Sequence, residues 1–301
     1  MTEKGFGYSY TNTRVRVMKS KLIDSNEYPK LLKMSLDQIA RYLGETDYKT
    51  EIDELGATYD RVNLIEFALN KNLSSSFKKV LNFSLKDSRE SIKLFLEKYD
   101  LHNIKTILRG KQSKESNKEI IYDLIPAGEL TFAFLSDAVK KSSSVEDAIE
   151  FFRKTPYYET MKKNSSNLTE MEDELDINYY SKLIAGTKGK IRSLMVETAK
   201  FTDALNEARA KETKIQLKTI LPQKKTYRKK IEVKSIEDSR IEFRKKIASD
   251  GIKLVNKFQR NSAPVIGYFV AKENEITNLR IISRGKHSGL PMELIEKQLV
   301  Y

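Results

Sequence analysis

A twelve-residue segment that occurs twice constrains this fold more than any other feature. The first copy spans residues 100–111, and the second spans residues 275–286. Three apolar residues recur at three-residue steps in both copies, which places them on one face of a helix. A repeat of this type predicts a scaffold of similar helical units. The identical positions are Asn103/Asn278, Ile107/Ile282, Arg109/Arg284, Gly110/Gly285 and Lys111/Lys286.

The end of the segment reads as the carboxyl end of a helix. Arginine, glycine and lysine follow the last apolar residue in each copy. Cations favour the negative end of the helix dipole, and a glycine there commonly adopts the left-handed cap conformation. We therefore predict that the two helices end at Gly110 and Gly285. Weaker copies of the helix are predicted at residues 60–71 and 203–211.

A second repeat supports the first, because residues 35–48 align with residues 144–157. Ser35 and Ser144 are predicted helix N-caps, and only the first has the glutamine that completes a capping box. Both helices should end before a Thr-x-Tyr step, at Tyr48 and Tyr157. Together the repeats predict an all-α protein of three similar helical units, covering residues 1–115, 116–211 and 212–301.

Catalytic chemistry has little support in the composition. The chain has no cysteine, which excludes disulfides, thiolate catalysis and cysteine-ligated zinc. Its two histidines lack metal-ligand spacing, and the acidic run at residues 170–176 lacks the glycine of a calcium loop. We predict no catalytic residue, metal or cofactor. There is also no apolar signal-peptide core and no stretch long enough to span a membrane.

The positive charge is concentrated in one segment. Of the net charge of +13, residues 209–260 carry +11. Such a segment favours an acidic partner, which could be nucleic acid, anionic lipid headgroups or an acidic protein surface, although a solvated surface is the simpler alternative. The predicted partner-binding residues are Lys224, Lys225, Arg228, Lys229 and Lys230.

Two early arginines, Arg14 and Arg16, follow a pair of tyrosines. Arginines beside aromatic side chains could bind RNA by stacking. They could equally pair with carboxylates of a neighbouring helical unit, which is commoner in helical bundles. With the repeated Arg109 and Arg284, they are the predicted polar contacts between units.

The N-terminal pattern Tyr8-x-Tyr10-x-Asn12-x-Arg14-Val-Arg16-x-Met18-Lys19 resembles the opening of the C subunit of the archaeal and bacterial A/V-type rotary ATPases, whose eukaryotic counterpart is called the d subunit. Further landmarks of that family follow in order over essentially the whole chain. They lie at residues 46–48, 99–110, 125–128, 155–157, 267–280 and 285–286.

The resemblance implies a funnel of three similar helical units around an approximate threefold axis, with no catalytic site and no cofactor. It implies a peripheral protein on the cytoplasmic face of the membrane, which sits on the membrane c ring and receives the central shaft made by the D and F subunits. A rotor part of this kind couples ion transport to ATP synthesis or hydrolysis.

Residues 190–260 depart from the family pattern, because this stretch is shorter than expected and unusually basic. The alternative function is nucleic-acid binding by a basic helical repeat.

Overall fold

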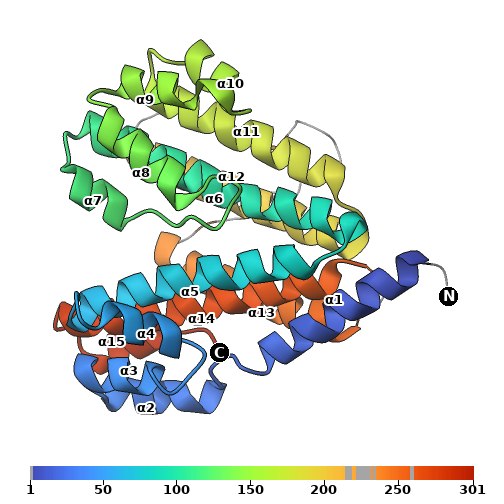
Figure 1. The fold of residues 1–301 in the computed structure, drawn as a ribbon, viewed down its shortest axis with the longest axis vertical. Coiled ribbons are helices and arrows are strands. Elements are labelled where there is room, and N and C mark those ends of the chain that lie inside the picture. The colour runs from blue at the N-terminus through green and yellow to red at the C-terminus, as the bar shows by residue number, and fades with distance from the viewer. Residues whose placement is uncertain (1–2, 214–218, 222–230, 232, 234, 258–260) are drawn as a thin grey trace. The chain divides into compact units, whose positions relative to one another are not determined.

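The computed structural model describes residues 3–213, 219–221, 231, 233, 235–257 and 261–301. Within these ranges every regular element is a helix and none is a strand, which confirms the all-α prediction (Figure 1). The helices form two compact units. We call residues 1–92 with 240–301 the terminal unit, and residues 93–239 the central unit.

The terminal unit is assembled from segments near both ends of the chain. Tyr28 stacks on Tyr301 with ring centroids 5.3 Å apart. The helix α14 packs against both α1 and α5. The long helices are α1 (Glu3–Lys19), α5 (Arg61–Phe83), α13 (Ile236–Lys257) and α14 (Ala263–His287). The short ones are η1 (Ser25–Glu27), α2 (Tyr28–Lys33), α3 (Leu36–Leu43), α4 (Lys49–Leu55) and α15 (Met292–Lys297).

The central unit combines three long helices with a group of short ones. The helix α11 packs against α12 and against the short α10. The long helices are α6 (Lys86–Gln112), which enters the unit at Lys93, α11 (Leu168–Gly186) and α12 (Gly189–Thr213). The short ones are α7 (Asn117–Tyr122), α8 (Phe132–Lys141), α9 (Val145–Phe151), η2 (Phe152–Lys154) and α10 (Tyr158–Lys163).

Local sequence explains where several short helices begin. Ser35 accepts a hydrogen bond from the Gln38 amide, and the Gln38 side chain accepts one from the Ser35 amide, which completes a capping box. Ser144 caps α9 by accepting from the Asp147 amide. Both predicted caps are therefore confirmed, and each helix ends before its Thr-x-Tyr step.

The repeated helices do end at the Arg-Gly-Lys step, at Gln112 in α6 and at His287 in α14, and the cations of that step lie in the last turn. The predicted left-handed glycine cap is wrong, because Gly110 and Gly285 lie within that last turn and do not adopt the left-handed conformation. They are glycines because another helix packs closely at each of them. The predicted end of the weaker copy at residues 60–71 is also wrong, because the helix α5 begins after Asp60 and continues past Lys71 to Phe83.

Candidate functional site

The same acid–tyrosine contact occurs in both units. In the central unit, Asp100 accepts hydrogen bonds from the Tyr157 hydroxyl at 3.2 Å and from the Glu129 and Leu130 amides at 2.9 Å each. In the terminal unit, Glu275 accepts from the Tyr48 hydroxyl at 2.6 Å. The two repeats found in the sequence thus meet in space, with the acid of one helix bound to the tyrosine of the other.

Burial changes the ionisation of these groups. It raises the pKa of Asp100 to about 6, although the two backbone amides and Tyr157 act to lower it. Burial, followed by the Glu275 carboxylate, raises the pKa of Tyr48 well above its ordinary value. Tyr157 shows the same upward pKa shift from burial and Asp100. Both tyrosines therefore remain neutral hydrogen-bond donors to a carboxyl group.

The identical asparagines clamp the chain downstream of each repeated helix. Asn103 donates to the Ile125 carbonyl at 2.9 Å and accepts from the Ile125 amide at 2.7 Å. Asn278 donates to the Val300 carbonyl at 2.7 Å and accepts from the Val300 amide at 3.1 Å. The separation along the chain is 22 residues in both cases. An asparagine supplies a donor and an acceptor on one planar group, so it can satisfy both polar atoms of a backbone residue.

The Asn103 clamp leads to a direct prediction. Asn103→Ala should lower the free energy of unfolding by about 1–3 kcal/mol, because the part-buried Ile125 amide loses its acceptor and the Ile125 carbonyl keeps only the Ala127 amide as a donor. Urea denaturation followed by circular dichroism measures this change. Glu90→Ala, an exposed substitution on the same helix, should shift the unfolding free energy by less than about 0.5 kcal/mol. Equal stabilities for the two variants would contradict a structural role for the clamp.

The identical glycines allow a short helix to approach. A Cβ atom on Gly285 would lie 2.7 Å from Ile295 Cγ1, and one on Gly110 would lie closer still to the same atom of Ile120. Both isoleucines are buried and stand ten residues after their glycine. A side chain at either position would therefore push α15 or α7 away from the repeated helix.

The identical lysines reach a short helix on the other side. Lys111 donates to the Val139 carbonyl at 2.7 Å, and Lys286 donates to the Leu32 carbonyl at 2.6 Å. These carbonyls lie in the last turns of α8 and α2, where a cation also meets the negative end of the helix dipole. Burial lowers the pKa of both lysines. Of the five identical residues, the asparagine, the glycine and the lysine therefore make matching contacts in the two units.

Each repeated arginine forms an ion pair with a carboxylate on another helix of its own compact unit. Arg109 makes a bidentate pair with Glu172 of α11, with Nε and Oε1 2.6 Å apart. Arg284 makes a bidentate pair with Glu66 of α5, with contacts of 2.7 Å and 3.2 Å. Arg280 also donates to Glu66, at 2.9 Å. Each arginine therefore joins segments that the sequence assigned to different helical units.

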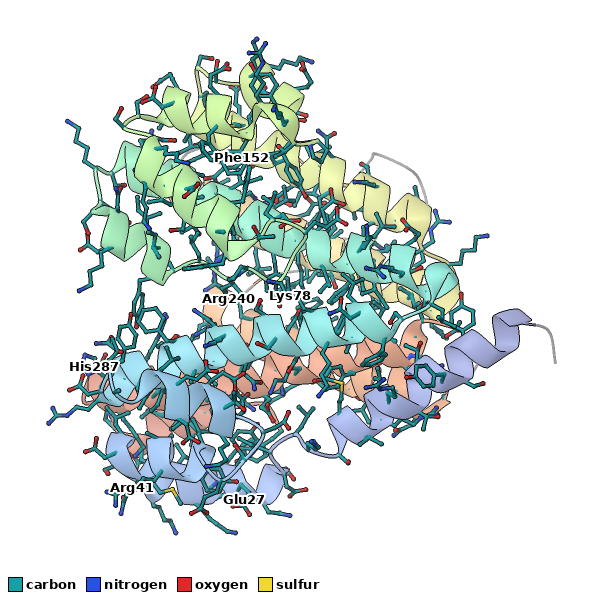
Figure 2. The ribbon with its side chains drawn as sticks, in the orientation of Figure 1. Glu27, Arg41, Lys78, Phe152, Arg240 and His287 are labelled. Carbon is teal, nitrogen blue, oxygen red and sulfur yellow. The ribbon has the colours of Figure 1, made fainter. Side chains whose placement is uncertain are left out.

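The two early arginines make other contacts. Arg14 donates to the Tyr10 hydroxyl at 2.6 Å and lies over the Phe83 ring, with its guanidinium carbon 4.4 Å from the centroid. Arg16 donates twice to the Val255 carbonyl of α13, at 3.3 Å and 3.2 Å. An open groove of about 410 Å³ runs beside Arg14. Its lining residues are Arg14, Ser75, Lys78, Lys79, Asn82 and Phe83; Figure 2 labels Lys78.

The predicted basic partner-binding residues lie outside the described part of the chain. These residues are Lys224, Lys225, Arg228, Lys229 and Lys230. In the described ranges, no group of histidine and acidic side chains is arranged to hold a metal ion. In the same ranges, no helix combines the length and the apolar character that crossing a bilayer requires.

A buried ion pair is the main feature that sequence reasoning missed. Lys272 is 1% exposed and lies 2.7 Å from Glu275, which is 3% exposed. Lys272 also donates to the Tyr48 hydroxyl at 3.0 Å. Its ammonium lies 4.1 Å from the centroid of the Tyr48 ring, within range of a cation–π interaction. One signal was present in the sequence, because Lys272 follows an apolar run at residues 263–271 that no solvent-exposed helix would carry.

A family model matches most of the chain. The model, described as the ATP synthase (C/AC39) subunit, matches residues 11–202 and again residues 187–298. The chain belongs to this ATP synthase subunit family. The family resemblance predicted from the sequence is therefore confirmed.

Curated relatives of this C/AC39 subunit match over almost their whole length. The C subunit of an A-type ATP synthase from Methanosarcina mazei is 33% identical, and the match covers 97% of this chain and 92% of the relative. The C subunit of the enzyme from Methanococcoides burtonii is 34% identical, with 97% and 94% covered. That of Archaeoglobus fulgidus is 31% identical, with 97% and 96% covered. The first alignment runs over 338 positions, so it needs gaps in this chain of 301 residues.

Proposed function

We propose that this chain is a non-catalytic rotor subunit of an A/V-type ATP synthase or ATPase. In this proposal it couples the central shaft of the D and F subunits to the membrane c ring. It carries the torque that links ion transport to ATP synthesis or hydrolysis. The observation that carries the proposal is the family match across residues 11–298, together with relatives that are named as C subunits of A-type ATP synthases and match over nearly their full length.

The contacts of the repeated helices suit a part that transmits torque. Such a part must resist bending, and a helix locked by several polar contacts at fixed positions is stiffer than one held by apolar packing alone. In each unit the repeated helix is held through its acid, its asparagine and its lysine. These contacts support a mechanical role for both units.

The proposal includes three similar units, at residues 1–115, 116–211 and 212–301, arranged as a funnel about an approximate threefold axis. A third acid supports this count. Asp203 accepts from the Ile220 amide at 2.6 Å and from the Leu221 amide at 3.2 Å. Asp100 holds two successive backbone amides in the same way. Asp203 also begins residues 203–211, the stretch that the sequence predicts as a weaker copy of the repeated helix.

The proposed location is the cytoplasmic face of the membrane, peripheral to it. The decisive test mixes the purified chain with the detergent-solubilised c ring and with the D–F shaft. We expect the chain to co-elute with each of them on size-exclusion chromatography, and to join the two when all three are present. The proposed function would be rejected if the chain co-eluted with neither the c ring nor the D–F shaft.

The basic segment provides a separate prediction for assembly. Changing Lys224, Lys225, Lys229 and Lys230 to glutamate should weaken assembly roughly tenfold or more while leaving the helices folded, because reversed charges repel an acidic partner surface. Titrating the variant against the shaft and against the ring measures the loss of affinity for each partner. The matched control changes Lys118, Lys140, Lys154 and Lys163, four exposed lysines of the central unit, to glutamate. Unchanged assembly of the first variant would remove the segment from the contact surface.

A further inference from the structure

Two stretches of the terminal unit carry positive charge without any acidic residue. Residues 4–23 contain five lysines and arginines and residues 67–86 contain four, and neither stretch contains an aspartate or a glutamate. The whole chain has 42 acidic residues in 301, so about six would be expected in forty positions. Because α1 packs against α5, the two stretches add up to one region of positive potential.

The groove beside Arg14 lies where these two helices meet, and we call it the α1–α5 groove. Its lining residues on α5 recur at three- and four-residue steps from Ser75 to Phe83, so they form one face of that helix. This face presents Lys78, Lys79 and two neutral donors, a serine hydroxyl and an asparagine amide (Figure 2 labels Lys78). All the lining residues belong to the terminal unit, so the groove needs no element of the central unit.

The guanidinium of Arg14 is held in place at this groove. It donates to the Tyr10 hydroxyl at 2.6 Å, and its central carbon lies 4.4 Å from the centroid of the Phe83 ring. In the described part of the chain, its hydrogen bond and its ring contacts are all with neutral groups. A guanidinium has five N–H donors, so several remain available to a ligand. An anion would therefore meet a cation whose orientation is already fixed, which favours binding.

The size and the lining of the groove indicate the class of ligand. Its volume of about 410 Å³ lies within the range of small-molecule sites. Arginine and lysine beside hydroxyl and amide donors favour phosphate oxygens. At about 1.5 Å per residue, Ser75 and Asn82 lie about 10 Å apart along α5, so a single phosphate would not reach both. Several phosphates on one molecule concentrate more negative charge in this volume than carboxylates on separate side chains of a protein partner.

We propose that the α1–α5 groove binds a small ligand that carries two or more phosphate groups, held by Arg14 of α1 and by Lys78 and Lys79 of α5. A soluble polyphosphate and a multiply phosphorylated lipid headgroup share this chemistry. Either ligand would bridge cations on two helices and so fasten α1 to the terminal unit. This inference goes beyond the proposed function and does not depend on it, because it concerns the chain by itself.

The test titrates the full-length chain with sodium tripolyphosphate by calorimetry at low ionic strength. Lys78→Gln with Lys79→Gln, the glutamine pair, should weaken binding by about fivefold or more, because two charge-assisted contacts are lost. Lys78→Arg with Lys79→Arg, the arginine pair, should keep the affinity within about twofold, because the charges remain. The control pair, Lys33→Gln with Lys49→Gln, removes the same charge from exposed positions of the same unit and should also stay within about twofold.

A second measurement reports the predicted bridging of α1 and α5. At ten times the dissociation constant of the unaltered chain, tripolyphosphate should raise the thermal unfolding midpoint by about 3 °C or more. The control pair should show the same rise, and the glutamine pair less than half of it. Without ligand, the midpoints of all variants should lie within about 2 °C of the unaltered chain, which shows that the substitutions leave the fold intact.

Two further probes distinguish the sources of the anion. They are phosphatidylcholine vesicles that contain phosphatidylinositol bisphosphate, and a hexaglutamate peptide. A loss of tripolyphosphate binding in the glutamine pair would identify a soluble polyphosphate, and a loss of vesicle binding alone would identify a lipid headgroup; either result supports the site. Equal binding of both phosphate probes by the glutamine pair and the control pair would overturn the inference, as would an equal loss in the arginine pair. A loss confined to hexaglutamate would overturn it in favour of an acidic protein segment.

Discussion

Lys272→Met is expected to lower the free energy of unfolding by about 3–5 kcal/mol, because it leaves a charge buried without its partner. Glu275 is 3% exposed, and its carboxylate lies 2.7 Å from the Lys272 ammonium. Methionine fills a similar volume, so the loss reports the missing charge and not a cavity. Urea denaturation followed by circular dichroism measures the change.

The chain contains a matched control for this experiment. Lys253 and Asp250 form an ion pair with the same spacing along a helix, at 2.9 Å, but their side chains are 57% and 32% exposed. Lys253→Met should therefore cost at most about 1 kcal/mol. Adding Glu275→Gln to Lys272→Met should recover part of the large loss, because the buried charge is removed. Similar losses for the two lysine variants would show that the Tyr48 hydroxyl and the Ile23 amide, which also donate to Glu275, are enough to stabilise its buried charge.

Gly267→Ala is expected to destabilise the terminal unit by about 2–4 kcal/mol, in the upper range for an overpacked core. A Cβ atom on Gly267 would collide with the Gly251 carbonyl oxygen and would lie 2.9 Å from the Val255 amide nitrogen and 2.7 Å from Val255 Cγ2. Because two of these atoms belong to the backbone of α13, no side-chain rotation relieves the contact. The two helices α13 and α14 would have to move apart.

The same urea titration measures this effect, and Ser249→Ala is its control. Ser249 is an exposed residue of α13 close to Gly251, so removing its hydroxyl should change the unfolding free energy by less than about 0.5 kcal/mol. A Gly267→Ala variant as stable as the Ser249→Ala variant would mean that α13 and α14 can separate at this point without loss.

Sequence periodicity predicted the helices, the repeat and two serine caps because these depend on residues close together along the chain. It also aligned Tyr48 with Tyr157 and Asp100 with Glu275. It did not predict that the tyrosine of one repeat binds the acid of the other, because that contact joins separate segments. Which helix face lies opposite a given residue is decided by tertiary packing, and a single sequence carries no record of it.

The repeated glycine shows why a correct alignment led to a wrong interpretation. Glycine at a helix end and glycine at a close helix crossing look alike in a sequence, and both fit an Arg-Gly-Lys step. Only Ile120 and Ile295, each ten residues further on, distinguish them, since each fills the space that a side chain would occupy. Glu66 was likewise not singled out, because a carboxylate becomes buried only when Arg280 and Arg284 approach from another part of the chain.

The terminal unit joins residues 1–92 to residues 240–301, and this has a consequence for protein synthesis. On the ribosome, the helices α2 to α5 emerge long before α14. Their apolar faces therefore stay exposed until α14 has been translated and can pack against them. The central unit, whose segments are continuous, can fold meanwhile. If translation stops before Asn278, the released chain would therefore have a folded central unit and an unfolded terminal unit, and chaperones and proteases would recognise the unfolded segments.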